Sequence, residues 1–187
     1  MKKLLFVVIA VLMLAFASVS AQETTTELPT LSFHTVGNIF SWGDSAEDVY
    51  NFLKNYEEAG LVITPEVDET YGKTISAEYE SEEEKFTYVF YFDNEEESLH
   101  EIECFSILAE GTDAGEVIKG LIDTYGLAEA DIYESEITNN IISSFEAGVA
   151  VAGDSTIVVI AGDDETAESY ASAAIYFFDR TYFENLN

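Results

Sequence analysis

The first strong helical pattern in the chain follows the stretch Phe40-Ser-Trp-Gly. Ser45, with Asp48 three residues later, fits the capping-box pattern that starts a helix, and Gly60 is a suitable stop. Between them, apolar residues recur at the spacing of one helix stripe: Val49, Phe52, Leu53 and Tyr56. The pattern therefore predicts an amphipathic helix that begins after Ser45.

A second helix is predicted by the same signals further along the chain. Asp113 and Glu116 repeat the cap, and Gly126 ends the segment. The inward-facing positions of this helix are Val117, Leu121 and Tyr125.

Elsewhere the apolar period falls from 3.6 to 2, as in strands. Residues 74–80 and 85–92 alternate, and 99–108 returns after the charged turn 93–98, which predicts an antiparallel hairpin. Residues 61–64 could form a further short strand, and after the second helix and the unassigned segment 132–136 the segments of strand composition are 140–152, 156–162 and 168–182.

The order of these elements suggests a duplication. Val49 aligns with Val117 at an offset of 68 residues, although two capped amphipathic helices can also converge by chance. We expect an α+β fold of two tandem helix-then-meander units, residues 40–110 and 111–183. Their strands would form one antiparallel sheet with both helices on one face.

The N-terminal segment predicts export. Lys2 and Lys3 precede an apolar run at 4–17, which is shorter than a membrane span of about 20 residues, and small residues follow up to Ala21. We expect a signal peptide at 1–21, with an uncleaved anchor as the alternative. Residues 22–38 would form a flexible leader and 39–187 one domain. The expected location is secreted, periplasmic or extracellular.

The charge balance limits the partners. The chain has 37 acidic and 7 basic residues, and loss of Lys2 and Lys3 would leave five basic residues and a net charge of −32. Nucleic acids and anionic lipid surfaces need clustered Lys and Arg, so we expect binding to neither. No second apolar segment is long enough to span a bilayer, so we expect no stable membrane insertion after signal cleavage. A basic partner would be attracted. The alternative is that the charge serves solubility in a salty medium.

Two motifs resemble a known group of proteins. Residues 40–49, Phe-Ser-Trp-Gly-Asp-Ser-Ala-Glu-Asp-Val, resemble the W-G-x-S-x-E-E-V helix entry of small exported bacterial domains, and residues 121–126 resemble their L-x-x-x-Y-G helix end. The chain is thus similar to the β-lactamase-inhibitor-like superfamily, which includes small outer-membrane assembly lipoproteins. The resemblance implies a non-enzymatic binder that uses its open sheet face. The chain lacks the disulfides of the inhibitors and the lipidated cysteine of the lipoproteins, so no interface residue carries over.

Motifs for catalysis and metal binding are weak. Gly43-Asp-Ser45 resembles the start of one esterase class, but that nucleophile needs a histidine base and only His34 and His100 exist. His100 and Cys104, four residues apart on one predicted strand face, lie roughly 13 Å apart, too far to share a zinc ion. The acidic runs 93–95 and 163–165 match no spaced calcium loop. We predict no catalytic residue, metal site or cofactor.

The exposed side of the predicted sheet carries the candidate binding residues. Val89 and Tyr91 face away from the predicted core, and aromatic side chains with acidic neighbours on such a face are typical of a binding patch. The alternative is ordinary cross-strand packing, with Trp42 as a lid on the first helix. The candidate binding residues are Trp42, Val89, Tyr91, Glu101, Glu103, Phe105, Tyr176 and Arg180.

These observations favour an exported, non-enzymatic domain that binds a protein or cell-envelope component through its sheet. The alternative is a small secreted hydrolase that uses paired carboxylates, which 37 acidic residues cannot identify from sequence. A deep pocket with two close carboxylates would favour the hydrolase, and a shallow sheet with exposed Tyr and Phe would favour the binder.

Overall fold

The computed structural model describes residues 29, 31–33, 35–68, 72–81, 85–95, 97–166 and 170–185. The predicted signal peptide lies outside these residues, as do His34 and most of the predicted leader. One compact unit begins at Leu31. Phe33 and Val36, which the sequence placed in the flexible leader, are buried in its core, so the packed unit starts before residue 39.

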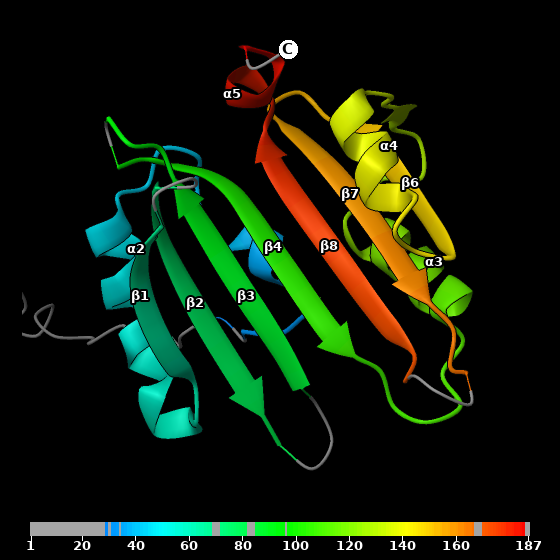
Figure 1. The fold of residues 1–187 in the computed structure, drawn as a ribbon, viewed down its shortest axis with the longest axis horizontal. Coiled ribbons are helices and arrows are strands. Elements are labelled where there is room, and N and C mark those ends of the chain that lie inside the picture. The colour runs from blue at the N-terminus through cyan, green and yellow to red at the C-terminus, as the bar shows by residue number, and fades with distance from the viewer. Residues whose placement is uncertain are drawn as a thin grey trace, which may run out of the picture. The chain divides into compact units, whose positions relative to one another are not determined.

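All eight strands of this unit belong to one antiparallel sheet (Figure 1). The strand order is β1-β2-β3-β4-β8-β7-β6-β5, so the last strand in the chain lies in the middle, between β4 and β7. The predicted hairpin is confirmed as β3 and β4. The strands are β1 (Val62–Asp68), β2 (Gly72–Glu80), β3 (Lys85–Phe92), β4 (Leu99–Ile107), β5 (Asp131–Ile132), β6 (Ala147–Ala152), β7 (Thr156–Asp163) and β8 (Ser172–Asp179).

The two predicted helices form where their caps place them. In α2 (Ala46–Leu53), the Ser45 hydroxyl accepts a hydrogen bond from the Asp48 amide at 3.1 Å. The helix continues as the 3₁₀ helix η2 (Lys54–Ala59), and Gly60 ends it with a φ of 99°. In α3 (Ala114–Thr124), the Asp113 carboxylate accepts from the Glu116 amide at 2.8 Å. A short 3₁₀ helix, η1 (Val36–Asn38), precedes them.

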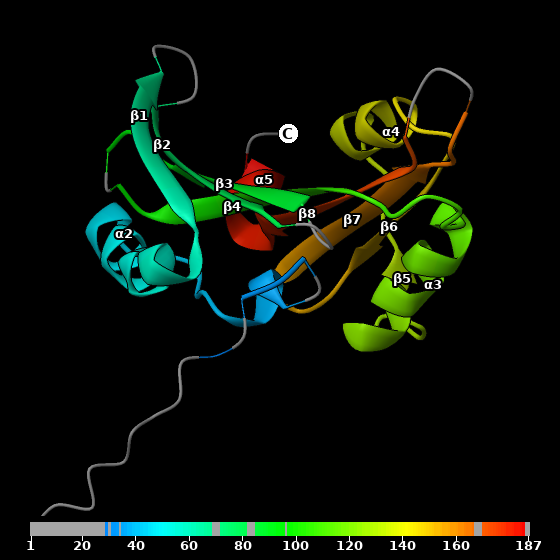
Figure 2. The same ribbon diagram turned by 90° about the horizontal axis from the view of Figure 1, so that it is seen from below.

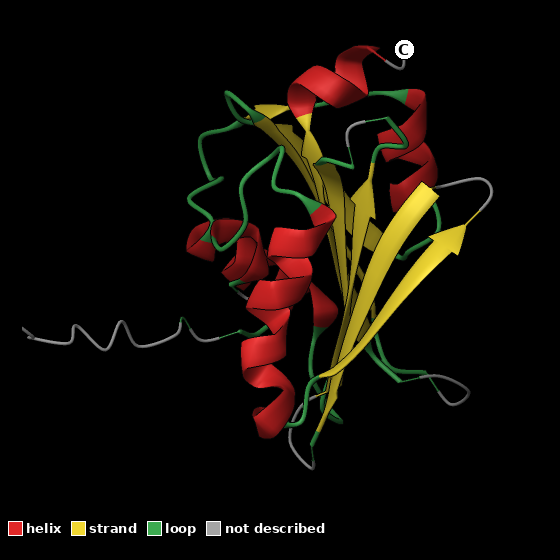
Figure 3. Ribbon diagram, turned by 90° about the vertical axis from the view of Figure 1, so that its left-hand side faces the viewer, coloured by secondary structure: helices red, strands yellow, loops and turns green. Residues whose placement is uncertain are grey.

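Helices cover both faces of the sheet. Helices α2 and α3 lie on one side, and α4 (Glu136–Ile142) lies on the other (Figure 2). Leu53 and Leu121 join the main core beneath α2 and α3, whereas Phe183 of α5 (Arg180–Asn185) packs in a second cluster on the opposite face of β7 and β8. Figure 3, viewed from the β1 side, shows the strong twist of the strands and the helices α2 and η2 that run beside them.

The prediction of two tandem helix-then-meander units is wrong, although the class, α+β with an antiparallel sheet, is confirmed. Helix α4 interrupts the second half between β5 and β6, in a region whose end was predicted as strand. Ser135 and Thr138 form a capping box there, and Thr138 is fully buried, so local capping and packing overcome the strand-like composition. Because α4 packs on the other face, the helices are not confined to one side.

Among the described residues, no helix has the length and apolar content to cross a membrane.

Candidate functional site

The sheet face opposite α2 is open over β1–β3, where no described helix lies against it (Figure 2). Alternation along the strands brings six of the predicted binding residues together on this face. Glu101 lies opposite Tyr91, and Glu103 lies between Val89 on β3 and Tyr176 on β8. We call this set the acid–aromatic strip: Val89, Tyr91, Glu101, Glu103, Phe105 and Tyr176.

The two glutamates of the strip are partly buried. Burial and the nearby Glu103 charge raise the pKa of Glu101 to about 8. Burial also raises the pKa of Glu103, and the Tyr91 hydroxyl, which donates to Glu103 Oε2 at 2.9 Å, partly offsets this rise. Burial, with the charges of both glutamates, raises the pKa of Tyr176 to about 12. Without a neighbouring cation, Glu101 is therefore mostly protonated at neutral pH, and a cation bound beside it would favour the ionised form.

Among the described residues, neither glutamate of the strip has a basic partner. The ion pairs within the described residues join Lys73 to Glu97, Lys85 to Glu80 and Arg180 to Glu184. The Glu101 side chain also makes no hydrogen bond within this part of the chain. Buried acids without a compensating group are unfavourable for stability, and such groups cluster at functional sites.

A cavity of about 310 Å³ adjoins the strip at the Glu101 end. The β3–β4 hairpin forms one wall, and helices α4 and α5 form the other. The hairpin contributes Tyr91 and His100, α4 contributes Ile137 and Ile141, and α5 contributes Tyr182 and Phe183. The lining is mainly apolar and aromatic, with Glu101 and His100 among its ionisable groups.

His100 reaches this cavity because of a β-bulge. Leu99 pairs with Phe92 and Glu101 pairs with Tyr91, so His100 is an extra residue in β4. In a regular strand, neighbouring residues point to opposite faces. Here His100 and Glu101 line one cavity, and the His100 ring stacks on Tyr182 with centroids 4.1 Å apart.

The imidazole of His100 is neutral near pH 7. Burial lowers its pKa, and this effect outweighs those of the Ser98 main chain, Asp93 and Asp179, which act in the opposite direction. Its buried Nδ1 has no hydrogen-bond partner of normal geometry among the described residues. The expectation that His100 and Cys104 share a strand face is wrong, because the bulge changes the alternation and Cys104 is buried in the main core.

A second hollow, of about 390 Å³, lies at the Phe105 end of the strip. The acidic run beside it holds main-chain amides rather than facing an ion. Asp163 accepts from the Glu146 amide at 2.7 Å, Asp164 from Ala114 at 2.9 Å and Glu165 from Gly111 at 3.1 Å. No group of three or more His, Cys, Asp and Glu side chains in the described segments is arranged to hold a metal ion.

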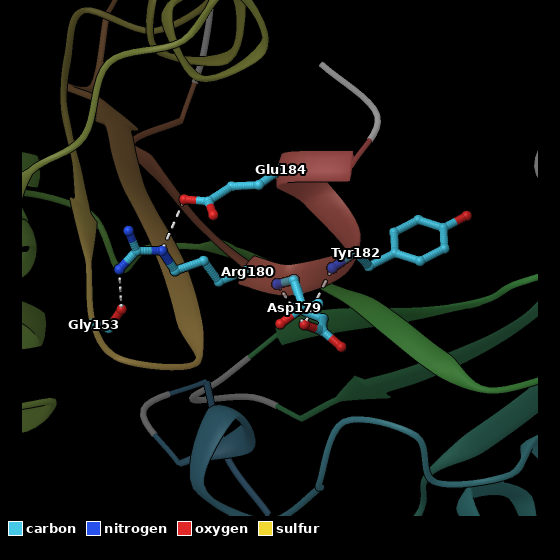
Figure 4. Close-up of polar contacts among 6 residues, drawn as sticks. Gly153, Asp179, Arg180, Tyr182 and Glu184 are labelled. Carbon is cyan, nitrogen blue, oxygen red and sulfur yellow. Dashed lines mark hydrogen bonds and ion pairs between the residues drawn. The ribbon is translucent and has the colours of Figure 1, made fainter.

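The other two predicted binding residues lie away from the strip. Trp42 packs against the main core, and its Nε1 donates to Thr156 Oγ1 at 2.9 Å. Arg180 begins α5 instead of continuing β8, and its guanidinium donates to Glu184 Oε1 at 2.8 Å and to the Gly153 carbonyl at 2.9 Å (Figure 4). Arg180 thus anchors α5, which positions Tyr182 and Phe183 at the cavity.

Sequence reasoning did not select the residues that complete the cavity, chiefly His100, Ile137 and Tyr182. His100 was considered only as an esterase base and as a zinc ligand, because alternation gives no sign of the bulge that turns it toward the cavity. Ile137 lies in the unpredicted helix α4, and Tyr182 lies in a segment predicted as strand.

Comparison with known proteins adds no relative. No family model matches the chain, no curated protein matches it, and no solved structure resembles it closely enough to count as a match. The resemblance to the β-lactamase-inhibitor-like superfamily therefore stays a prediction.

Proposed function

We propose that this protein is an exported binding domain that holds a basic segment of a partner protein on the acid–aromatic strip. The observation that carries the proposal is the glutamate pair: Glu101 and Glu103 are partly buried, adjacent on one strand face, and without an ion-pair partner in the described residues. A Lys or Arg of a partner would supply the missing positive charge.

The surroundings of the pair suit a protein surface. Tyr91 and Tyr176 flank the glutamates, and Phe105, further along the strip, is 43% exposed. Aromatic residues of this kind are enriched in the cores of interfaces, where they provide contact area at low entropic cost. The net charge of −30 would also steer a basic partner toward the protein.

One observation favours the second candidate, a small secreted hydrolase. Glu101 has a raised pKa, and it lines a cavity with the neutral His100, as general acids and bases do. Against this, Glu101 and Glu103 project from one strand face, so they would meet one side of a ligand rather than flank a scissile bond. Turnover of model glycosides or esters that Glu101→Gln abolishes would support the hydrolase.

The test of the binding proposal uses oligolysine as the probe, with residue-specific NMR at physiological salt. We expect the largest shift changes at Tyr91, Glu103, Phe105 and Tyr176. The variant Glu101→Gln/Glu103→Gln should bind about tenfold more weakly or worse, as expected for lost charge-assisted hydrogen bonds.

The matched control removes the same charge from η2, on the helix-covered side, through Glu57→Gln/Glu58→Gln. This control should change the affinity by less than about twofold, because salt screens exposed charges at that distance. Equal losses in both double variants would show that oligolysine senses only the net charge, and the proposal would then fail.

A further inference from the structure

The cavity at the Glu101 end of the strip has the size and lining of a pocket for one side chain. Its volume of about 310 Å³ is at the lower limit for ligand pockets, which span about 300–1,000 Å³. Ile137, Ile141 and Phe178 supply apolar wall, which suits an alkyl stem. Glu101 and His100 supply polar groups at the same cavity.

These polar groups need a donor. The Glu101 side chain has no hydrogen bond or ion pair within the described residues, and the buried His100 Nδ1 has no hydrogen-bond partner of normal geometry among them, although the Ser98 main chain acts on the ring. In a neutral imidazole with its proton on Nε2, Nδ1 is an acceptor, and an ionised carboxylate only accepts. An anion would be repelled here, because Asp93 lines the cavity and an anion would also oppose the ionisation of Glu101. A cation with N–H donors satisfies both groups.

We propose that this cavity binds a primary alkylammonium group, delivered as a lysine side chain of the basic partner. The inference rests on the proposed function for its source of lysine. An ammonium group has three N–H donors and a full positive charge, so it can donate to the Glu101 carboxylate and to His100 Nδ1 together. The four-carbon stem of lysine would lie against the apolar wall.

The ionisable groups around Glu101 make the binding dependent on pH. Glu103 flanks it on β4, Tyr91 faces it from β3, Tyr176 from β8 and Tyr182 from α5, and none of them is a cation. His100, Asp93 and Asp179 complete the surroundings. The ionised fraction of a carboxyl with a pKa of about 8 rises from about a tenth at pH 7 to about nine-tenths at pH 9. An alkylamine stays charged over this range, so its affinity should rise about tenfold.

The experiment titrates the purified protein with n-butylamine, which mimics the lysine side chain, and follows the His100 and Tyr182 rings by NMR. We expect saturable binding that Glu101→Gln weakens about tenfold or more. Glu78→Gln, an exposed glutamate of β2, is the matched control and should change the affinity by less than about twofold. Butyltrimethylammonium, which has the charge but no N–H, should bind about tenfold more weakly. Equal binding of the two cations, or no change between pH 7 and pH 9, would overturn the assignment.

A competition arm separates this inference from the proposed function. If lysine enters the cavity, butylamine should displace oligolysine from the His100 and Tyr182 signals. If butylamine does not bind while oligolysine still depends on Glu103, the cavity assignment fails and the strip proposal stands. If butylamine binds while the affinity for oligolysine is unchanged in the strip variants, the strip proposal fails, and so does the claim that the partner delivers a lysine side chain to the cavity.

Discussion

Replacement of Glu101 by glutamine should stabilise the fold, and the gain should grow with pH. Burial and the Glu103 charge raise the pKa of Glu101 from 4.5 to about 8 in the folded state. Between these values the folded protein keeps a proton that the unfolded chain has lost. The unfolded state therefore binds fewer protons, and the stability of the wild-type fold falls as the pH rises.

The expected size follows from the two pKa values. Each pH decade between them is worth up to about 1.4 kcal/mol, which gives about 3.5 kcal/mol between pH 5 and pH 8. Part of the Glu101 side chain still reaches solvent, so we expect a net difference of about 2–3 kcal/mol between the variant and the wild type over this range. A buried glutamine amide carries its own cost, but that cost does not change with pH.

Urea denaturation at pH 5, 7 and 9 measures this difference directly. The variant should approach the wild type at pH 5 and exceed its free energy of unfolding at pH 9. Glu78→Gln, on an exposed site of β2, should stay within about 0.5 kcal/mol of the wild type at each pH. A difference in the free energy of unfolding between Glu101→Gln and the wild type that stays constant from pH 5 to pH 9 would refute the reasoning.

Three further predictions concern the core and the caps. Ser45→Ala removes the N-cap of α2 and should lower the free energy of unfolding by about 1 kcal/mol in urea denaturation, whereas Ser45→Asp should restore most of it. Gly37→Ala should cost about 1–3 kcal/mol, because a Cβ there would overlap the Phe177 ring; Gly120→Ala, in open space on α3, should instead add about 0.5–1 kcal/mol. Cys104, 1% exposed, should react with a thiol reagent only in denaturant, as followed by mass spectrometry, and rapid labelling of the native protein would contradict its placement.

The features that could be predicted from sequence are those set by local chemistry. Ser45 and Asp113 cap their helices as expected, because a short polar side chain before an apolar stripe can accept a hydrogen bond from a free amide of the first helical turn. The strip residues of β3 and β4 meet because period-2 alternation fixes the face of each residue once the hairpin forms. These signals need no knowledge of distant contacts.

The features that could not be predicted depend on tertiary contacts. Residues 140–142 were predicted as the start of a strand, yet they lie in α4, because Ser135 and Thr138 form a capping box at its start and Ile141 packs on the sheet. The strand before Arg180 ends because Asp179 accepts from the Thr181 and Tyr182 amides, which starts α5. The His100 bulge exists only relative to its partner strand, so no pattern in β4 alone reveals it.

The central position of β8 has a consequence for how the molecule assembles. Seven strands precede β8 in the chain, yet β4 and β7 are joined only through it. Until residues 172–179 arrive, two partial sheets would each expose an inner strand with unpaired main-chain groups, the state most open to pairing with other chains. The sheet is therefore completed late. Truncation or cleavage that removes residues 172–179 would expose the unpaired main-chain groups of β4 and β7, so the product would tend to aggregate rather than fold as a slightly smaller protein.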